Sequence, residues 1–241
     1  MLKEIGSVFS FLTIIPTNNA SLEGTAKYMH IFPLVGIIIG LLIGSIGFGL
    51  SLYLDPMIVS LLVVASIAVI TGIHHTDGLA DFADGLMTKG SRSKKLKAMK
   101  DLSTGSAGIV TIVLYAVGAI IALSLTSGFE LFKAILLSEI LAKFSMVLMA
   151  SVGNSAAVGS NSPFMQIMKD KRRIAVAGAI TLTPLVFLGG EVGLILFASS
   201  IVITMLLVGI STRSFGGVTG DVLGATNELT RLASLLIFVS I

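Results

Sequence analysis

The sequence predicts an all-α membrane protein, a polytopic bundle of about six to seven transmembrane helices in which residues 1–241 form a single membrane-embedded domain. Two observations carry this prediction. Only 12% of the 241 residues are charged and 54% are apolar, whereas a soluble domain carries about 25% charged residues. The apolar residues also form runs long enough to cross about 30 Å of hydrocarbon as helices.

Six apolar runs stand out, and most reach the roughly 17–25 residues that a transmembrane helix needs. The expected spans are residues 31–54, 57–73, 107–126, 131–152, 174–189 and 192–210. Residues 232–241 begin a seventh helix that is too short to cross at about 1.5 Å per residue. Residues 5–15 are also short, and we expect them to lie at the interface or to re-enter the membrane.

Basic residues gather on one side of this topology, in segments 1–30, 74–106, 153–173 and 211–231, which hold 14 of the 16 Lys and Arg residues. The positive-inside rule makes that side cytoplasmic, in a multi-pass protein of the cytoplasmic membrane. The basic excess therefore indicates loops beside the lipid bilayer, with no nucleic-acid partner. The same side carries the acidic residues Asp77, Asp81, Asp84, Asp101, Asp221 and Glu228.

Several kinds of chemistry are excluded. The chain has no cysteine, which removes disulfides, thiolate metal sites and a cysteine nucleophile. It also lacks a P-loop, a dinucleotide-binding fingerprint and a serine-hydrolase elbow.

The most informative block is residues 74–85, which places three carboxylates in a largely apolar chain. In a helix, Asp77, Asp81 and Asp84 stand at i, i+4 and i+7 and share one face. Three like charges repel unless a cation neutralises them, and carboxylate oxygens suit Mg²⁺. The alternative is a solvated turn whose acids cap helices. His75, two residues before the first acid, is a candidate general base, or else an ordinary interfacial histidine.

A second acidic block follows at residues 216–228. Four glycines in nine residues can present backbone N–H groups to phosphate, as nests do, although an ordinary glycine-rich turn is the alternative. We expect Gly217, Gly220 and Glu228 to bind substrate. Asp221, or Glu228 seven residues later, would complete the metal shell.

Between these blocks, Lys89–Lys100 is first a topology signal and a contact for anionic lipid. We assign Lys100 at its end to substrate phosphate, and the neighbouring Asp101 to substrate binding.

Two further patterns concern packing. Gly36, Gly40 and Gly44 recur every four residues and allow close helix approach; packing inside the bundle is favoured, and a homo-oligomer seam is the alternative. Glu139 and Lys143 stand at i, i+4 within one span and predict a buried ion pair.

Four motifs in order resemble a known family: Pro33-Leu-Val-Gly36, His75-x-Asp-Gly-Leu-Ala-Asp-x-Ala-Asp-Gly85, Met99-Lys-Asp101 followed by Gly105 and Gly108, and Gly216-Gly-x-Thr-Gly-Asp-x-Leu-Gly-Ala225 followed by Glu228. The chain is similar to the cobalamin synthase family. It departs from the family pattern at Ile14 or Ile15, where a basic residue is expected, and at Lys143, where an arginine is expected.

The resemblance implies a Mg²⁺-dependent phosphotransferase that joins adenosylcobinamide-GDP to α-ribazole, or its 5′-phosphate, and releases GMP. The metal ligands would be Asp77, Asp81, Asp84 and Asp221, with Asp81, Asp84 and Asp221 also catalytic, and a carboxylate or His75 accepting the hydroxyl proton.

Three other functions fit parts of the pattern. The acidic motif is loosely similar to that of the CDP-alcohol phosphotransferases. An aspartate-rich prenyltransferase would have a longer Asp spacing and an Asn where Thr76 stands. A divalent-cation carrier would need acids in mid-span, where only Glu139 lies.

Overall fold

The computed structural model describes residues 2–17, 21–156 and 162–241, and within them the secondary structure is helical apart from one isolated β-bridge. This confirms the predicted all-α class. The helices are α1 (Leu2–Leu12), α2 (Leu22–Lys27), the 3-10 helix η1 (Met29–Ile31), α3 (Phe32–Ser51), α4 (Pro56–Ile70), α5 (His74–Met87), α6 (Arg92–Ala98), α7 (Ser106–Ser124), α8 (Gly128–Val152), α9 (Ser162–Met168), α10 (Lys171–Phe215) and α11 (Gly220–Phe238).

Four helical segments in the described part of the chain are long and apolar enough to cross a membrane: Met29–Ser51, Ser106–Ser124, Gly128–Val152 and Lys171–Phe215. A fifth span results if α4 and α5, which meet at an angle of 91°, are counted together. The membrane class is therefore confirmed with four to five candidate spans, and the expected six to seven are not reached by length and composition.

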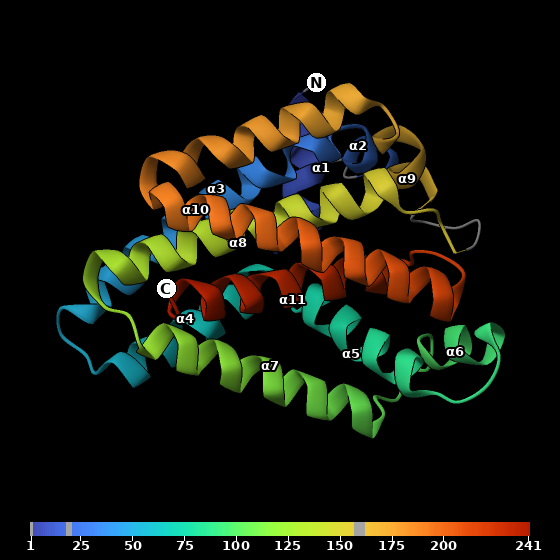
Figure 1. Ribbon diagram of the computed structural model, residues 1–241, viewed down its shortest axis with the longest axis horizontal. Helices are drawn as coiled ribbons and strands as arrows, with labels where there is room; N and C mark the ends of the chain where they lie inside the picture. The colour runs from blue at the N-terminus through green and yellow to red at the C-terminus, as the bar shows by residue number, and fades with distance from the viewer. Residues whose placement is uncertain (1, 18–20, 157–161) are drawn as a thin grey trace.

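Helix α10 differs from the expectation of two separate runs. Its 45 residues are one helical stretch interrupted at Gly190, where φ is 54° and ψ is −128°. A backbone conformation of this kind is open to glycine and strained for other residues. Figure 1 shows that the two limbs, residues 171–189 and 191–215, fold back along each other as a hairpin.

Helix α8 lies at the centre of the bundle, and the three-glycine face of α3 packs against it. A Cβ atom added at Gly36 would lie 2.7 Å from the carbonyl oxygen of Glu139, and one at Gly40 would lie 2.8 Å from the Cα of Leu136. These contacts confirm packing within the bundle. Because α8 covers this face, it is not a seam between two chains.

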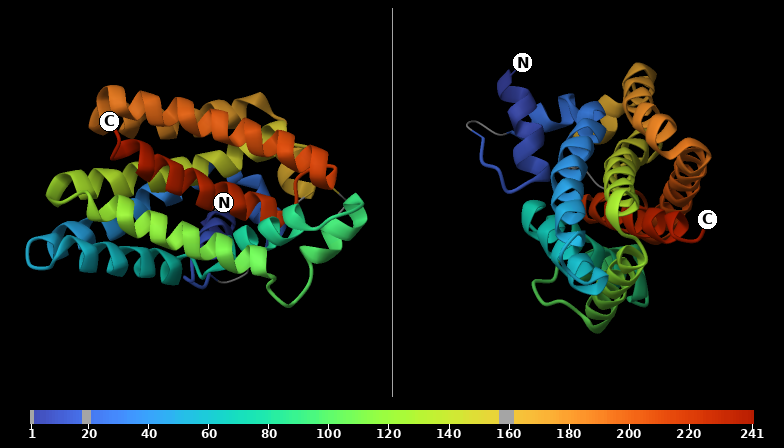
Figure 2. Two further views of the ribbon diagram at one scale, coloured as in Figure 1. Left: turned by 60° about the horizontal axis from the view of Figure 1, so that its bottom comes forward. Right: turned by 90° about the vertical axis from the view of Figure 1, so that its left-hand side faces the viewer.

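Helix α11 runs through the middle of the molecule, packed against α5, α7, α8 and α10 (Figures 1 and 2). The short helix expected at 232–241 is thus the end of a 19-residue helix that begins at Gly220. It is not among the candidate spans, because it carries Asp221, Glu228 and Arg231.

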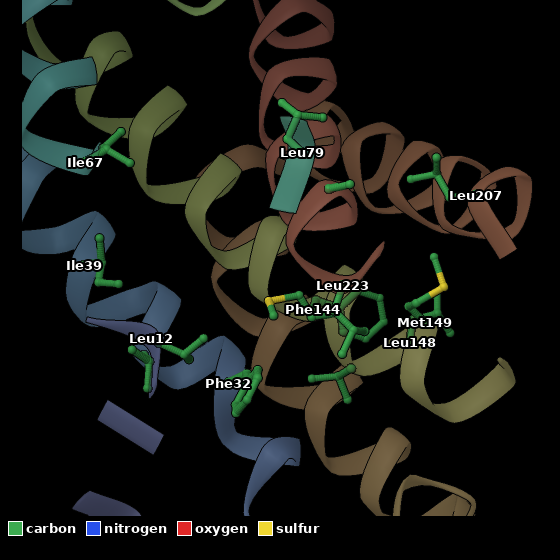
Figure 3. Close-up of a cluster of buried hydrophobic side chains, with 14 of the residues drawn as sticks. Leu12, Phe32, Ile39, Ile67, Leu79, Phe144, Leu148, Met149, Leu207 and Leu223 are labelled. Carbon is green, nitrogen blue, oxygen red and sulfur yellow. The ribbon is translucent and has the colours of Figure 1, made fainter. Parts of the chain in front are cut away.

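The hydrophobic core joins helices that are far apart in the sequence. Figure 3 shows Leu12, Phe32, Leu79, Phe144 and Leu223, from α1, α3, α5, α8 and α11, among its buried side chains. Apolar side chains also cover the outer faces of α4, α7 and α10, where many are about half exposed. A contiguous apolar exterior of this kind fits contact with lipid.

The N-terminal helices pack beside this bundle. Helix α1 has 11 residues, and the Thr25 hydroxyl of α2 donates to the Ser7 carbonyl of α1 at 3.1 Å. The segment after α1 is tied to the end of α4, where the N–H of Ile14 donates to the carbonyl of Ile70 at 2.8 Å. The described part of the short N-terminal run is therefore packed against the bundle end that carries α9.

The two ends of the bundle differ. Figure 1 shows the α3–α4 turn, the α7–α8 turn and the bend of α10 at one end, and α6, α9 and the start of α11 at the other. The acidic blocks and most basic residues belong to this second end.

Candidate functional site at the crossing of α5 and α11

The acidic block of α5 is positioned by a sharp turn at the end of α4. Gly72 has a φ of 66° and Ile73 a φ of 64°. Positive φ is open to glycine, but a β-branched residue adopts it rarely and at a cost. The strained turn sends α5 away from α4 at 91° and places His74 and His75 in its first turn.

Helices α5 and α11 touch through glycines. A Cβ atom added at Gly78 would lie 3.1 Å from both the Cα and the carbonyl oxygen of Asp221, and one at Gly224 would lie 3.2 Å from the carbonyl oxygen of His75. A Cβ atom at either position would make an unusually tight contact with the other helix, so glycine favours this close crossing. The crossing brings the start of α11 against the acidic face of α5, so the two blocks predicted to share a site do meet.

The carboxylates of the two blocks lie close enough to repel one another. Helix α5 lies beyond the 91° bend that follows α4, and it is not one of the four helices that could cross a membrane on their own. Partial burial, followed by repulsion from Asp221, Asp77 and Asp84, raises the pKa of Asp81 to about 6. Burial also raises the pKa of Asp221, while the Thr219 hydroxyl that donates to it at 3.3 Å partly offsets this.

This donor set fits a hard dication, because like charges crowd together and all donors are oxygens. Within the described ranges, no group of three or more His, Asp or Glu side chains is already arranged as a metal cage. Mg²⁺ commonly takes one or two carboxylates and fills its remaining positions with water and substrate phosphate, so a complete protein cage is not required.

Asp84 caps a helix, which is the role that the sequence offered as the alternative to metal binding. One of its carboxylate oxygens accepts from the N–H of Gly105 at 2.7 Å, and the other from the N–H of Gly108 at 2.8 Å. These groups belong to the start of α7, so Asp84 caps that helix and fastens it to α5. The capping alternative therefore holds for this residue, and its metal and catalytic roles stay predictions.

Glu228 does not join the acidic cluster, which corrects its predicted substrate role. Its side chain is 1% exposed and forms an ion pair with Arg231, which also pairs with Glu139 on α8. The physical reason is position, because Glu228 lies two helical turns inside the bundle from Asp221. Removing Arg231 would leave Glu228 buried without an ion-pair partner.

The predicted pair Glu139–Lys143 is confirmed and belongs to the same network. Lys143 Nζ lies 3.4 Å from Glu139 Oε2, with both side chains fully buried, and donates to Asn227 Oδ1 at 2.8 Å. The network thus joins α8 to α11, with two carboxylates balancing two cations.

Lys100 and Asp101 have different surroundings. Both are exposed, but the positive charge of Lys100 is near enough to lower the pKa of Asp221. Asp101 instead accepts hydrogen bonds from the N–H and the hydroxyl of Ser103, at 3.0 and 2.7 Å. These bonds hold Asp101 in a local turn, and its substrate role stays a prediction.

The glycines of the second block are mostly structural. Gly216 ends α10 with a φ of 86°. A Cβ atom at Gly217 would lie 2.5 Å from the carbonyl oxygen of Asn154, so this glycine is required for close packing, and its substrate contact stays a prediction. Gly220 and Gly224, by contrast, line a cavity beside the acidic cluster.

That cavity has a volume of about 360 Å³ and lies between α1, α2, α5, α8, α9 and α11. His75, Gly78 and Asp221 form part of its wall. Sequence reasoning missed the wall residues Phe11 and Phe164, because an apolar residue in an apolar helix carries no local sign of a site.

Comparison with known proteins shows the family to which the chain belongs. Residues 4–239 match the sequence model of CobS, cobalamin-5-phosphate synthase. The chain belongs to the CobS family. Relatives named adenosylcobinamide-GDP ribazoletransferase occur in Archaeoglobus fulgidus at 34% identity, covering 98% of this chain and 96% of the relative, and in Methanocella arvoryzae at 32%, covering 98% and 94%. A third, from Pyrococcus abyssi, is 33% identical over 96% of this chain and 95% of its own. No solved structure matches the chain.

The resemblance to this family that the sequence motifs predicted is therefore confirmed, and it extends over nearly the whole chain. The prenyltransferase and cation-carrier alternatives are thereby set aside. The two motifs that best carried the resemblance are those that meet where α5 crosses α11.

Proposed function

We propose that this chain is an adenosylcobinamide-GDP ribazoletransferase, which joins adenosylcobinamide-GDP and α-ribazole, or its 5′-phosphate, in cobalamin biosynthesis. Family membership and the names of the full-length relatives support this. The structural observation that carries it is the glycine crossing of α5 and α11, which gathers Asp77, Asp81 and Asp221 beside one cavity.

In this reaction a ribose hydroxyl of α-ribazole attacks the phosphorus on the cobinamide side of the diphosphate. A new P–O bond forms, and the bond from that phosphorus to the bridging oxygen breaks. GMP leaves with the bridging oxygen. Asp221 lies in the cavity wall and has a raised pKa, so it is suited to accept the hydroxyl proton. Lys100, close enough to affect Asp221, would offset charge on the departing phosphate.

We propose Mg²⁺ as the cofactor, held by Asp77 and Asp81, which leaves Asp221 to accept the hydroxyl proton and Asp84 to cap α7. The ion would neutralise negative charge on the diphosphate, which is the main requirement of phosphoryl transfer. The repulsion that raises the pKa of Asp81 supports a dication here, because bound positive charge would relieve it.

We further propose six transmembrane spans, namely α3, α4, α7, α8 and the two limbs of α10. The bundle end that carries α6, α9 and the start of α11 would face the cytoplasm, as the positive-inside rule predicts for its lysines and arginines. The substrates would then reach the site from the cytoplasm, and the basic helix α6 would lie against anionic lipid.

The test uses full-length protein purified in detergent and incubated with adenosylcobinamide-GDP, α-ribazole and Mg²⁺. Mass spectrometry is expected to find GMP and a cobalamin product. Asp81→Asn should reduce the rate by about a hundredfold or more, since it removes charge stabilisation at the reacting phosphate. Asp55→Asn, an exposed position at the start of α4 whose capping role Asn can also fill, is the matched control and should keep its activity. Absence of GMP with the wild-type protein would refute the proposed function.

A further inference from the structure

The cavity beside Asp221 has the size and the walls of a binding site for a small aromatic group. Its volume of about 360 Å³ lies in the range of about 300–1,000 Å³ that is usual for small-molecule pockets. The apolar side chains that line it come from five different helices: Phe11, Leu22, Met146, Phe164 and Leu223. A corrin macrocycle is too large for such a space, whereas a single nucleoside base is not.

His75 provides a second and independent sign of a ligand. Its side chain is only 5% exposed, it lines the cavity, and its Nδ1 atom has no hydrogen-bond partner among the described residues. Buried polar side chains are nearly always paired, so an imidazole without a partner in a cavity wall marks a place where a bound group completes its hydrogen bonds.

The position of Asp221 links the cavity to the chemistry. This residue is part of the cavity wall and also one of the carboxylates that repel Asp81. A nucleoside with its base among the apolar side chains would therefore have its ribose close to the acidic cluster. That is the position required of an acceptor whose hydroxyl attacks a phosphate.

We propose that this cavity binds the base of the acceptor nucleoside, a proposal that rests on the proposed function. The aromatic base of α-ribazole is held by Phe11, Phe164 and the neighbouring aliphatic side chains. The His75 imidazole forms a hydrogen bond with the one ring nitrogen of the base that carries no sugar. His75 is then a specificity-determining residue for the acceptor, and the guanine of the donor binds elsewhere.

The first test separates the two substrates kinetically. His75→Leu leaves no protein group unpaired, since Nδ1 has no partner to lose, and the protein is expected to fold. Loss of one hydrogen bond should raise the KM for α-ribazole by about tenfold, with the KM for adenosylcobinamide-GDP unchanged. His75→Asn, whose amide can replace the hydrogen-bonding group of the imidazole, should restore most of the affinity. His30→Asn, on a different surface, is the matched control.

A second variant tests the cavity without changing α5. Ser10→Leu on α1 fills the space, and calorimetric titration with α-ribazole alone should show that binding is lost while circular dichroism stays unchanged. If the variants instead raise the KM for the donor, or weaken GMP binding, the cavity holds guanine and the proposal is wrong. If neither KM changes in an active enzyme, the proposal is also wrong. An inactive wild-type protein would refute the proposed function itself.

Discussion

Asp81 shows how one side chain reports on its neighbours. Its carboxyl group is partly buried and faces like charge from Asp77, Asp84 and Asp221, which together raise its pKa to about 6. Asp84, three residues further along the same helix, instead accepts hydrogen bonds from two N–H groups at the start of α7. Two carboxylates on one face of α5 thus have different surroundings, because only Asp84 contacts the N-terminus of another helix.

The raised pKa of Asp81 predicts how pH acts on metal-free protein. The folded state holds a proton on this carboxyl up to about pH 6, whereas the unfolded chain releases it near 3.8. Stability should therefore be higher at pH 5 and fall as pH rises toward 7.5. Thermal unfolding followed by circular dichroism in EDTA should show this fall for the wild type and a smaller one for Asp81→Asn.

Mg²⁺ provides the complementary measurement at pH 7.5. The ion should raise the unfolding temperature of the wild type and have little effect on Asp81→Asn, since stabilisation requires a bound ligand. An equal response of both proteins to Mg²⁺ would argue against Asp81 as a ligand.

Among the elements, α11 and its neighbours determine the geometry of the site. Glycines on α5 and α11 allow the two helices to cross closely, and the network of Glu139, Arg231 and Glu228 holds α11 against α8. The first contact brings the acidic blocks together, and the second fixes where along α8 they stand.

A larger residue at the crossing should separate the two acidic blocks. Gly78→Val would place its side chain against the backbone of Asp221, since even a Cβ atom at this position would lie only 3.1 Å from that backbone. Overpacking of this kind costs typically about 1–3 kcal/mol, and GMP release should fall because Asp221 moves away from α5. Gly178→Val, where a Cβ meets nothing within 4 Å, is the control. Full activity of the Gly78 variant would mean that the crossing does not position the site.

Removal of the central cation should destabilise the bundle. Arg231→Met leaves Glu139 and Glu228 buried without this partner, and breaking a buried pair costs about 3–5 kcal/mol. The free energy of unfolding in mixed detergent should fall accordingly. Arg213→Met, at an exposed position on α10, should have little effect. Equal stability of the two variants would show that the buried pairs contribute little.

In the molecule as a whole, most of the charged residues lie at one end of the bundle. The lysines of α6 lie at this end, and turns such as the one containing the exposed Tyr53 lie at the other. In the proposed topology, the site lies at a membrane surface and not at its middle. Substrates with charged diphosphates can reach such a site from water.

The absence of cysteine in the chain makes this orientation directly testable. Single variants Lys97→Cys and Tyr53→Cys place one thiol at each end of the bundle. A maleimide that cannot cross membranes should label Tyr53→Cys in intact cells, and Lys97→Cys only in inverted vesicles. The opposite pattern would place the active site outside the cell.

Much of the fold could be predicted from local patterns. The runs that became α3, α7 and α8 are recognisable by length and hydropathy, and the spacing of Gly36, Gly40 and Gly44 correctly indicated packing within the bundle. The pair Glu139–Lys143 was equally visible, since both partners stand on one helix. Patterns of this kind depend on periods of three to four residues, which a sequence displays directly.

The sequence alone specifies the chemistry that is available: a membrane bundle, two acidic blocks and a set of glycines. How these residues are used depends on the packing of the helices. This packing assigned Asp84 to a helix cap, Glu228 to a buried ion pair, and Gly217 to a close contact, and it formed a cavity from helices at both ends of the chain. The reason is that these contacts join residues far apart in the chain, and their partners are selected by how whole helices pack.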